Sequence, residues 1–236
     1  MPHDGIARNL DTIRRRIQAA ADRAGRAPAS ITLVAVSKTF SADDVRAAAD
    51  AGQRVFGENR VQEALPKIEA LHGLDLEWHL IGHLQSNKAR KAVSALAWIE
   101  SIDSVDLLTK VDAAAVEAGV RRSVLIQVDL AHEATKHGAD TRTVRPLIDA
   151  ALESRALDLR GLMLVPPMPE RAEDSRPWFR RLRALRDTLV ADGVPADRLA
   201  DLSMGMSHDF EVAIEEGATL VRVGSAIFGA RPASPA

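Results

Sequence analysis

The sequence contains no cysteine and no tyrosine, two residue types that support much of protein chemistry. Without cysteine the chain forms no disulfide, no thiolate metal site and no covalent intermediate on sulfur. Without tyrosine it loses a common general base. It also has no apolar run long enough to span a bilayer and no N-terminal secretory signal, so we expect a cytoplasmic protein without a membrane partner.

An excess of charge of one sign is missing as well. The chain carries 31 Lys and Arg against 33 Asp and Glu, a net charge of −2, and nucleic-acid-binding domains usually show a basic excess. We therefore expect no nucleic-acid partner. The hydrophobic share of 46% over 236 residues is enough for one large α/β domain or two small ones.

What the chain does have is a regular alternation of two patterns. Apolar positions at helical spacing cover about residues 4–24, and eight short apolar runs follow, each with a helical pattern after it. The expected strands are 31–38, 54–56, 76–81, 97–102, 124–130, 159–165, 198–203 and 219–223. This rhythm predicts a single (β/α)8 TIM barrel with an extra N-terminal helix, in one domain over 1–236 with a barrel core of about 31–230. The alternative is an open doubly wound sheet, although no Gly-x-Gly-x-x-Gly turn follows the first strand.

One lysine stands out because it ends an apolar strand. The run from Ile31 to Val36 is rich in β-branched residues and continues into Ser37 and Lys38, whereas none of the other five lysines ends such a run. Ligands bind at the carboxyl ends of strands in α/β proteins, where partial desolvation favours the neutral amine that attacks a carbonyl. Lys38 is therefore the candidate for a Schiff base; the alternative is a lysine that only reaches the surface.

The last two expected strands end in turns typical of phosphate sites. Ser207 is expected to begin a helix after the seventh strand, and Gly224 and Ser225 begin another after the eighth. Helix N-termini after strands seven and eight of a TIM barrel often bind phosphate, although both serines could be plain N-caps. Arg222 interrupts the last apolar strand and shares a face with Gly224, so it either points into the barrel mouth or forms a structural ion pair.

Two further polar residues and one polar group have two interpretations each. Asn59 and His79 lie near the ends of expected strands. Asn59 is either a site residue or a helix cap, and His79 is either a site residue or a hydrogen-bonded core histidine. The group His132, Glu133 and His137 has the composition of a metal set but no regular ligand spacing. We interpret it as a solvated loop and expect no metal.

These motifs together resemble the YggS/PROSC family, the pyridoxal phosphate homeostasis proteins, from about Leu33 to Arg231. The motifs that carry the resemblance are Ala35-Val36-Ser37-Lys38, Phe56-Gly57-Glu58-Asn59, Trp78-His79-Leu80-Ile81-Gly82, Leu84-Gln85-Ser86-Asn87-Lys88, Ser203-Met204-Gly205-Met206-Ser207 and Val221-Arg222-Val223-Gly224-Ser225-Ala226-Ile227-Phe228-Gly229. The resemblance implies a single TIM barrel similar to the barrel domain of alanine racemase (PLP fold type III). It also implies pyridoxal 5′-phosphate (PLP) as the cofactor and a role in PLP homeostasis rather than an established enzymatic activity.

The resemblance further implies a role for each candidate residue. Lys38 would carry PLP as a Schiff base and Arg222 would face the pyridine nitrogen. The residues implied for the phosphate are Ser207, Gly224 and Ser225, and those implied beside the ring are Asn59 and His79. We expect PLP binding without substrate turnover, apo PLP-dependent enzymes as candidate partners, and a monomer, since a closed barrel has no open sheet edge.

Two enzymatic alternatives remain. An amino-acid racemase of the alanine type uses a lysine and a tyrosine from a second domain on opposite faces of its substrate, and this chain has no tyrosine and no expected second domain. His79 is the remaining candidate for a second base. An aldolase-like barrel enzyme that forms a Schiff base between Lys38 and a sugar phosphate would explain the lysine and the phosphate turns, but not the motif match.

Overall fold

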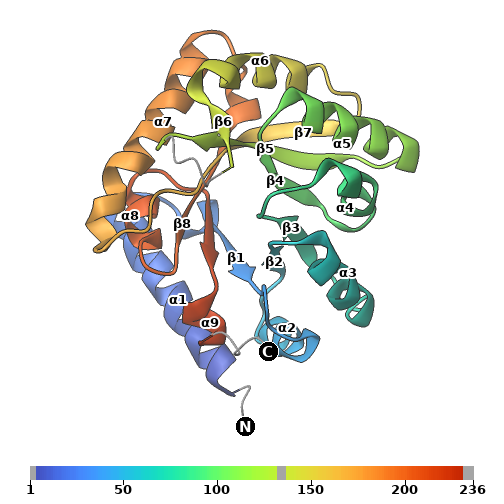
Figure 1. Ribbon diagram of the computed structural model, residues 1–236. Coiled ribbons are helices and arrows are strands. Elements are labelled where there is room, and N and C mark those ends of the chain that lie inside the picture. Colours follow the sequence, from blue (N-terminus) through green and yellow to red (C-terminus); the bar gives the residue numbers. More distant parts are fainter. Residues whose placement is uncertain (1–3, 132–136, 231–236) are drawn as a thin grey trace.

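The strands form a closed parallel barrel. The structure, a computed structural model, describes residues 4–131 and 137–230. Within these residues the strand order is β4-β3-β2-β1-β9-β8-β7-β5-β6, and β4 also pairs with β5, so eight strands close on themselves inside a ring of helices (Figure 1). The two-residue strand β6 pairs only with β5 and lies outside the circuit. The predicted (β/α)8 barrel is thus confirmed.

The bounds of the elements lie close to the expected ones. The strands are β1 (Thr32–Val36), β2 (Val55–Glu58), β3 (Glu77–Leu80), β4 (Trp98–Ile102), β5 (Arg122–Asp129), β6 (Ala139–Asp140), β7 (Leu157–Leu164), β8 (Asp201–Met206) and β9 (Leu220–Val223). The helices are α1 (Asp4–Arg23), α2 (Ala42–Asp50), α3 (Val61–Ala70), α4 (Ala89–Ala95), α5 (Val105–Ala118), α6 (Thr141–Leu152), α7 (Arg176–Ala191), α8 (Phe210–Glu215) and α9 (Ser225–Phe228).

The prediction that Ser207 begins a helix is wrong. Residues 207–209 form a turn, and α8 begins at Phe210. The buried Asp209 carboxylate holds this turn, because it accepts the Met206 N–H at 2.7 Å and the Ser175 hydroxyl at 2.6 Å. Ser207 is therefore free of a capping role on α8 and faces the neighbouring turn instead.

The joint between the first and last strands positions the site. β1 pairs with β9 in parallel register, with Val34 opposite Arg222 and Ala35 opposite Val223. Helix α1 packs on α8 and α9 across this joint, and Asn9 donates a hydrogen bond to the Ile227 carbonyl at 2.8 Å. The residues that follow β1 and β9 therefore lie side by side although almost the whole chain separates them.

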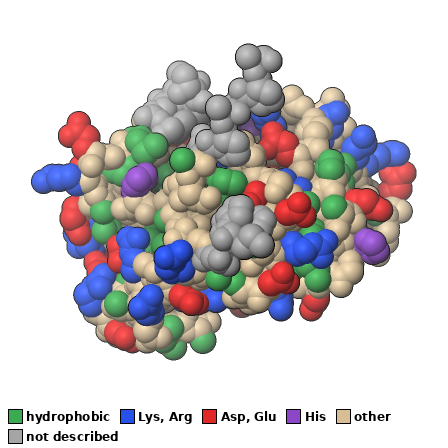
Figure 2. Space-filling model, turned by 90° about the horizontal axis from the view of Figure 1, so that it is seen from below, with side chains coloured by type: hydrophobic (Ala, Val, Ile, Leu, Met, Phe, Trp, Pro, Cys, Tyr) green, Lys and Arg blue, Asp and Glu red, His purple; other side chains and the backbone are tan. Residues whose placement is uncertain are grey.

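The surface shows no field of one sign in the view of Figure 2, where acidic and basic side chains alternate across the visible face. This distribution agrees with the net charge of −2.

Across 4–131 and 137–230, no helix combines the length and the apolar character needed to cross a membrane.

Candidate functional site

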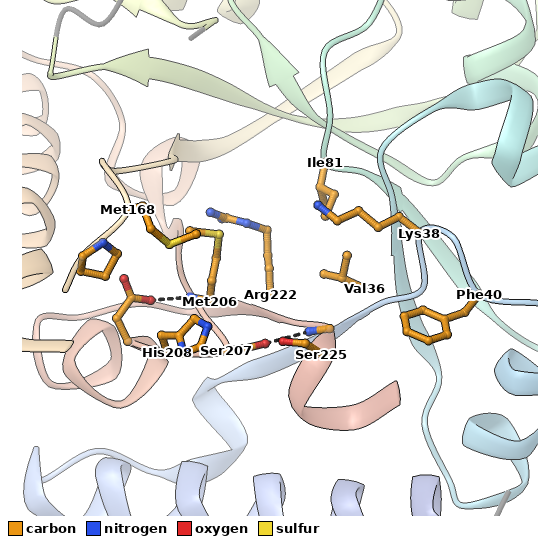
Figure 3. Close-up of a pocket in the computed structure, with 13 residues that line it drawn as sticks. Val36, Lys38, Phe40, Ile81, Met168, Met206, Ser207, His208, Arg222 and Ser225 are labelled. Carbon is orange, nitrogen blue, oxygen red and sulfur yellow. Dashed lines mark hydrogen bonds between the residues drawn. The ribbon is translucent and has the colours of Figure 1, made fainter. Parts of the chain in front are cut away.

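A pocket opens where β1, β8 and β9 end. Five of the seven residues predicted for the site line it, namely Lys38, Ser207, Arg222, Gly224 and Ser225. Apolar side chains complete the wall, among them Val36, Phe40, Ile81, Met168 and Met206. In Figure 3 the Lys38 side chain extends from the right toward Arg222, the Arg222 guanidinium turns to the other side, toward Met168, and Ser207 and Ser225 lie along one edge. The pocket thus combines an amine, a guanidinium and two hydroxyls.

The backbone around Lys38 is held in one unusual conformation. Thr39, directly after the lysine, has a φ of 69°, in the left-handed region that β-branched residues rarely adopt. The turn persists because the Phe40 N–H donates to the Ser37 carbonyl at 3.0 Å and the Phe40 ring stacks on Phe228 of α9, 5.0 Å between centroids. Strained backbone of this kind concentrates at functional sites.

A buried ion pair holds the residue before Lys38. The Lys67 ammonium donates to the Glu58 carboxylate at 2.6 Å and to the Ser37 carbonyl at 2.7 Å, and the Ser37 hydroxyl donates to the same Glu58 oxygen at 2.6 Å. Burial raises the pKa of Glu58, and the hydrogen bonds from Lys67 and Ser37 only partly offset this effect. The cluster fixes Ser37 at three atoms, since its N–H also donates to the Gly57 carbonyl at 3.0 Å.

The last two barrel turns meet at Gly224. Its N–H donates to the Ser207 hydroxyl at 3.2 Å, so the turn after β8 contacts the start of α9 directly. A Cβ on Gly224 would lie 3.1 Å from the Val36 carbonyl oxygen, which leaves little room for a side chain. Gly205 has a φ of +91°, and a Cβ there would lie 2.5 Å from the Cβ of Ala213. Glycine at both positions therefore allows the two turns to approach each other.

Arg222 lies at the base of the pocket and is almost fully buried. Its guanidinium donates to the Ser203 hydroxyl at 2.5 Å and to the Leu164 carbonyl at 2.8 Å. Burial lowers the pKa of Arg222, and the negative charges of Glu100 and Asp209 oppose this shift. Arg222 thus lines the pocket, as one interpretation from the sequence has it, and its hydrogen bonds go to a hydroxyl and a carbonyl while the charges of Glu100 and Asp209 favour its ionised form.

From Arg222 a chain of polar side chains runs through the barrel interior. We call it the interior chain: Arg222, Ser203, Glu100, His79 and Glu77. The Ser203 hydroxyl donates to Glu100 at 2.5 Å, and the two ring nitrogens of His79 lie 2.6 Å from Glu100 and 3.0 Å from Glu77. Because a carboxylate only accepts hydrogen bonds, both nitrogens carry a proton.

The charges of the interior chain stabilise one another. Burial alone would lower the pKa of His79, but its hydrogen bonds to Glu100 and Glu77 outweigh burial and raise it. Burial alone would raise the pKa of Glu100, but the hydrogen bond and charge of His79, with the charge of Arg222, lower it. A protonated His79 and an ionised Glu100 therefore depend on each other.

Two predicted site residues do not lie in the pocket. His79 belongs to the interior chain, where both nitrogens are hydrogen-bonded and its ring stacks on Trp98 with centroids 5.0 Å apart. Asn59 lines a separate polar cavity with Arg60 and His83. Neither residue lines the pocket, and their placement beside a cofactor ring stays a prediction.

Four polar residues in or near the site were given no role from the sequence. Glu58 and Glu100 are fully buried, and a glutamate inside an apolar strand is a signal that a partner charge exists. Ser203 gave no such signal, because a small hydroxyl is common in strands. His208 lines the pocket and is exposed, and its place next to Ser207 in the sequence was the available clue.

The fold is that of the alanine racemase barrel class. The family described as "Alanine racemase, N-terminal domain" matches residues 8–232. The pyridoxal phosphate homeostasis protein of Aquifex aeolicus is 45% identical over 222 residues, covering 94% of this chain and 96% of the relative. That of Escherichia coli strain K12 is 42% identical over 232 residues, covering 96% and 97%. The chain belongs to the family of pyridoxal phosphate homeostasis proteins.

Solved structures agree with this assignment. PipY of Synechococcus elongatus PCC7942, described with PLP bound, has a TM-score of 0.84 and 40% identity, covering 95% of this chain and 100% of that one. Alanine racemase of Clostridium difficile 630 has a TM-score of 0.76 but 15% identity, and the match covers 98% of this chain and 58% of the racemase. The second likeness shows the barrel fold alone.

Proposed function

We propose that the protein binds PLP in the pocket at the ends of β1, β8 and β9, and that it serves PLP homeostasis without turning over a substrate. The observation that carries the proposal is the convergence of Lys38, Ser207, Arg222, Gly224 and Ser225 in one pocket. The names of the relatives and the PLP-bound PipY structure support the choice of ligand.

The residues present fit the three chemical parts of PLP. The Ser207 and Ser225 hydroxyls and the close backbone at Gly224 suit a phosphate, and the apolar wall suits a flat ring. Lys38 supplies the amine for a Schiff base, and PLP supplies the aldehyde and an electron-withdrawing ring. Arg222 would face the pyridine nitrogen. Because a guanidinium donates protons in hydrogen bonds and accepts none, that nitrogen would stay unprotonated and the ring would withdraw electrons less strongly.

The bases that the pocket offers support the proposal that no substrate is turned over. Acid–base catalysis on both faces of a substrate needs two positioned groups. His79 was the candidate for the second base from the sequence, but both of its ring nitrogens are hydrogen-bonded, to Glu100 and to Glu77. His208 keeps the racemase alternative open, because its imidazole lines the pocket. In Figure 3, however, it lies beside Ser207 and away from the Lys38 ammonium.

Covalent trapping tests the lysine. Borohydride reduction of the protein with PLP, followed by peptide mapping, should place the pyridoxyl group on Lys38. Lys38→Ala should abolish the label and the visible absorbance of bound PLP. The exposed helical Lys110, paired with Asp106 at 2.7 Å, offers a matched control, because Lys110→Ala should label like the parent. A label that survives in Lys38→Ala refutes the assignment.

A pair of glycine substitutions tests the phosphate cradle. Gly224→Ala adds a Cβ 3.1 Å from the Val36 carbonyl oxygen, whereas Gly73→Ala adds one with nothing within 4 Å. Gly224→Ala should weaken PLP by at least tenfold and pyridoxal, which lacks the phosphate, much less. Gly73→Ala should leave both affinities unchanged. Equal losses for PLP and pyridoxal in Gly224→Ala would show that the turn does not bind phosphate.

Activity and cell assays test the role. The protein with PLP should show no racemisation, transamination or decarboxylation across a panel of amino acids. Turnover of about 1 per second or faster that disappears in Lys38→Ala would establish an enzyme instead. Cells lacking the protein should have altered free PLP, restored by the parent and not by Lys38→Ala. A cytoplasmic location, a monomeric state and apo-enzyme partners stay predictions.

A further inference from the structure

Outside the PLP pocket, three metal-ligating side chains from distant parts of the sequence come together at the same end of the barrel. They are His83, Asp103 and His137, and their donor atoms all lie within 4.8 Å of one another. The His83 Nδ1 lies 3.7 Å from an Asp103 oxygen, and the rings of His83 and His137 stack with centroids 3.7 Å apart. We propose that these three residues bind one divalent transition-metal ion of the zinc, cobalt and nickel class.

The barrel itself places the three residues side by side. His83 follows β3, Asp103 follows β4 directly, and His137 precedes β6, which pairs with the end of β5. The strands β3, β4 and β5 are consecutive neighbours in the barrel. Because the carboxyl ends of parallel neighbours meet at one rim, the three side chains converge there.

A neighbouring glycine packs closely next to each of the two histidines. Gly82 carries a carbonyl that accepts the Ser101 hydroxyl at 2.7 Å, and a Cβ on it would lie 2.3 Å from the Asn59 carbonyl oxygen. The His137 carbonyl accepts the Gln127 amide at 2.7 Å. Gly138 has a φ of +145°, and a Cβ there would lie 2.7 Å from the Asp129 nitrogen. Metal binding therefore requires side-chain rotation only, which limits the entropy lost on binding.

The donors are not satisfied by one another. At 3.7 Å the His83 nitrogen and the Asp103 oxygen are too far apart for a hydrogen bond, and stacked imidazoles have no hydrogen bond between them. Zinc–nitrogen and zinc–oxygen bonds of about 2 Å would set the donors roughly 3 to 4 Å apart, so the cluster needs to contract by about an ångström. A metal ion supplies the missing attraction.

The donor set indicates the class of metal. Two imidazoles and one carboxylate suit borderline ions, whereas magnesium and calcium prefer all-oxygen sites. Three protein ligands leave coordination positions open to water or an exchangeable ligand. The sequence had grouped His137 with His132 and Glu133, which lie outside the described residues. The structure assigns it two partners that precede it by more than thirty positions.

Calorimetric titration of the untagged protein with Zn²⁺, without added PLP, tests the site. We expect one site with micromolar or tighter affinity, and a loss of at least tenfold in each of His83→Ala, Asp103→Asn and His137→Ala. His72→Ala removes an exposed histidine elsewhere on the surface and should bind like the parent. Because both ligand histidines are exposed, the variants should fold, and circular dichroism checks this.

A second readout identifies the ligands. Co²⁺ bound to the parent should give visible d–d bands of a nitrogen- and oxygen-ligated ion, which the three variants lose and His72→Ala keeps. Mg²⁺ should not compete with Zn²⁺. Zinc binding that is equally tight in the parent and in a His83→Ala, His137→Ala double variant would overturn the proposal, as would competition by Mg²⁺ at equal concentration.

Discussion

Replacing Glu100 by glutamine removes the charge at the centre of the interior chain and keeps the shape of the side chain. In the parent, the fully buried carboxylate accepts from His79 at 2.6 Å and from Ser203 at 2.5 Å, and it balances the charge of Arg222. Breaking a buried ion pair from one side costs about 3 to 5 kcal/mol of unfolding free energy. For a chain of this size, that corresponds to a drop in Tm of roughly 6 to 20 °C.

The free energy of unfolding that Glu100→Gln loses depends on pH, and the structure gives the direction of this dependence. The pKa of His79 is raised above its ordinary 6.5, so its stabilisation is complete below that pH and disappears as pH rises through the raised value. The pKa of Glu100 is lowered from 4.5, so its stabilisation is complete above that pH and disappears as pH falls through the lowered value. The cost of Glu100→Gln is therefore largest between these limits and smaller in alkali, where the Arg222 contribution alone persists.

Urea unfolding followed by circular dichroism, at pH 6 and at a series of higher pH values, measures both effects. Glu117 is a suitable control, because its exposed carboxylate lies 3.0 Å from Arg90 at the surface, and Glu117→Gln should change stability by less than about 0.5 kcal/mol. A cost for Glu100→Gln no larger than that of Glu117→Gln would refute the role of the interior chain. A cost that does not fall at any pH above 6 would refute the contribution of His79.

Two further substitutions probe the surroundings of the site. Lys67→Met removes the cation beside buried Glu58. The free energy of unfolding should therefore fall increasingly as pH rises above 4.5, the ordinary pKa of a glutamate. Thermal unfolding from pH 4 to 8 measures this loss, and a loss that does not depend on pH would contradict the argument. Gly82→Ala places a Cβ 2.3 Å from the Asn59 carbonyl oxygen and should lower the free energy of unfolding in urea by about 1 to 3 kcal/mol. Gly73→Ala places a Cβ with nothing within 4 Å and should not lower it. Equal values for the two variants would contradict the packing argument.

The barrel and the core of the pocket could be predicted because their signals are local. The apolar run into Lys38 and the glycine–serine turn at Gly224 depend on neighbours in sequence, and both lie in the pocket. The start of α8 could not be predicted in the same way. Ser207 looks like an N-cap, but the competing acceptor is Asp209, whose orientation depends on Ser175, more than thirty positions earlier.

The positions of His79 and Asn59 outside the pocket lining share a physical cause. A residue near the carboxyl end of a strand can point into the barrel, toward the rim or toward the helices, and strand position alone does not choose among these. For His79 the choice depends on Glu100, which lies on the neighbouring strand and balances its charge. A buried glutamate in an apolar strand therefore indicates that a nearby histidine can be its structural partner.

Barrel closure, rather than any one motif, assembles the pocket. In the doubly wound alternative the first and last strands would not have to be neighbours, and Lys38 and Gly224 would have no reason to meet. In the barrel, β1 pairs with β9 from Thr32 opposite Leu220 to Ala35 opposite Val223, so the turn of Lys38 and the turn of Gly224 emerge together. Because both ends of the chain supply this pairing, we infer that the pocket forms only after the whole barrel has closed, and that ligand binding stabilises the fold as a unit.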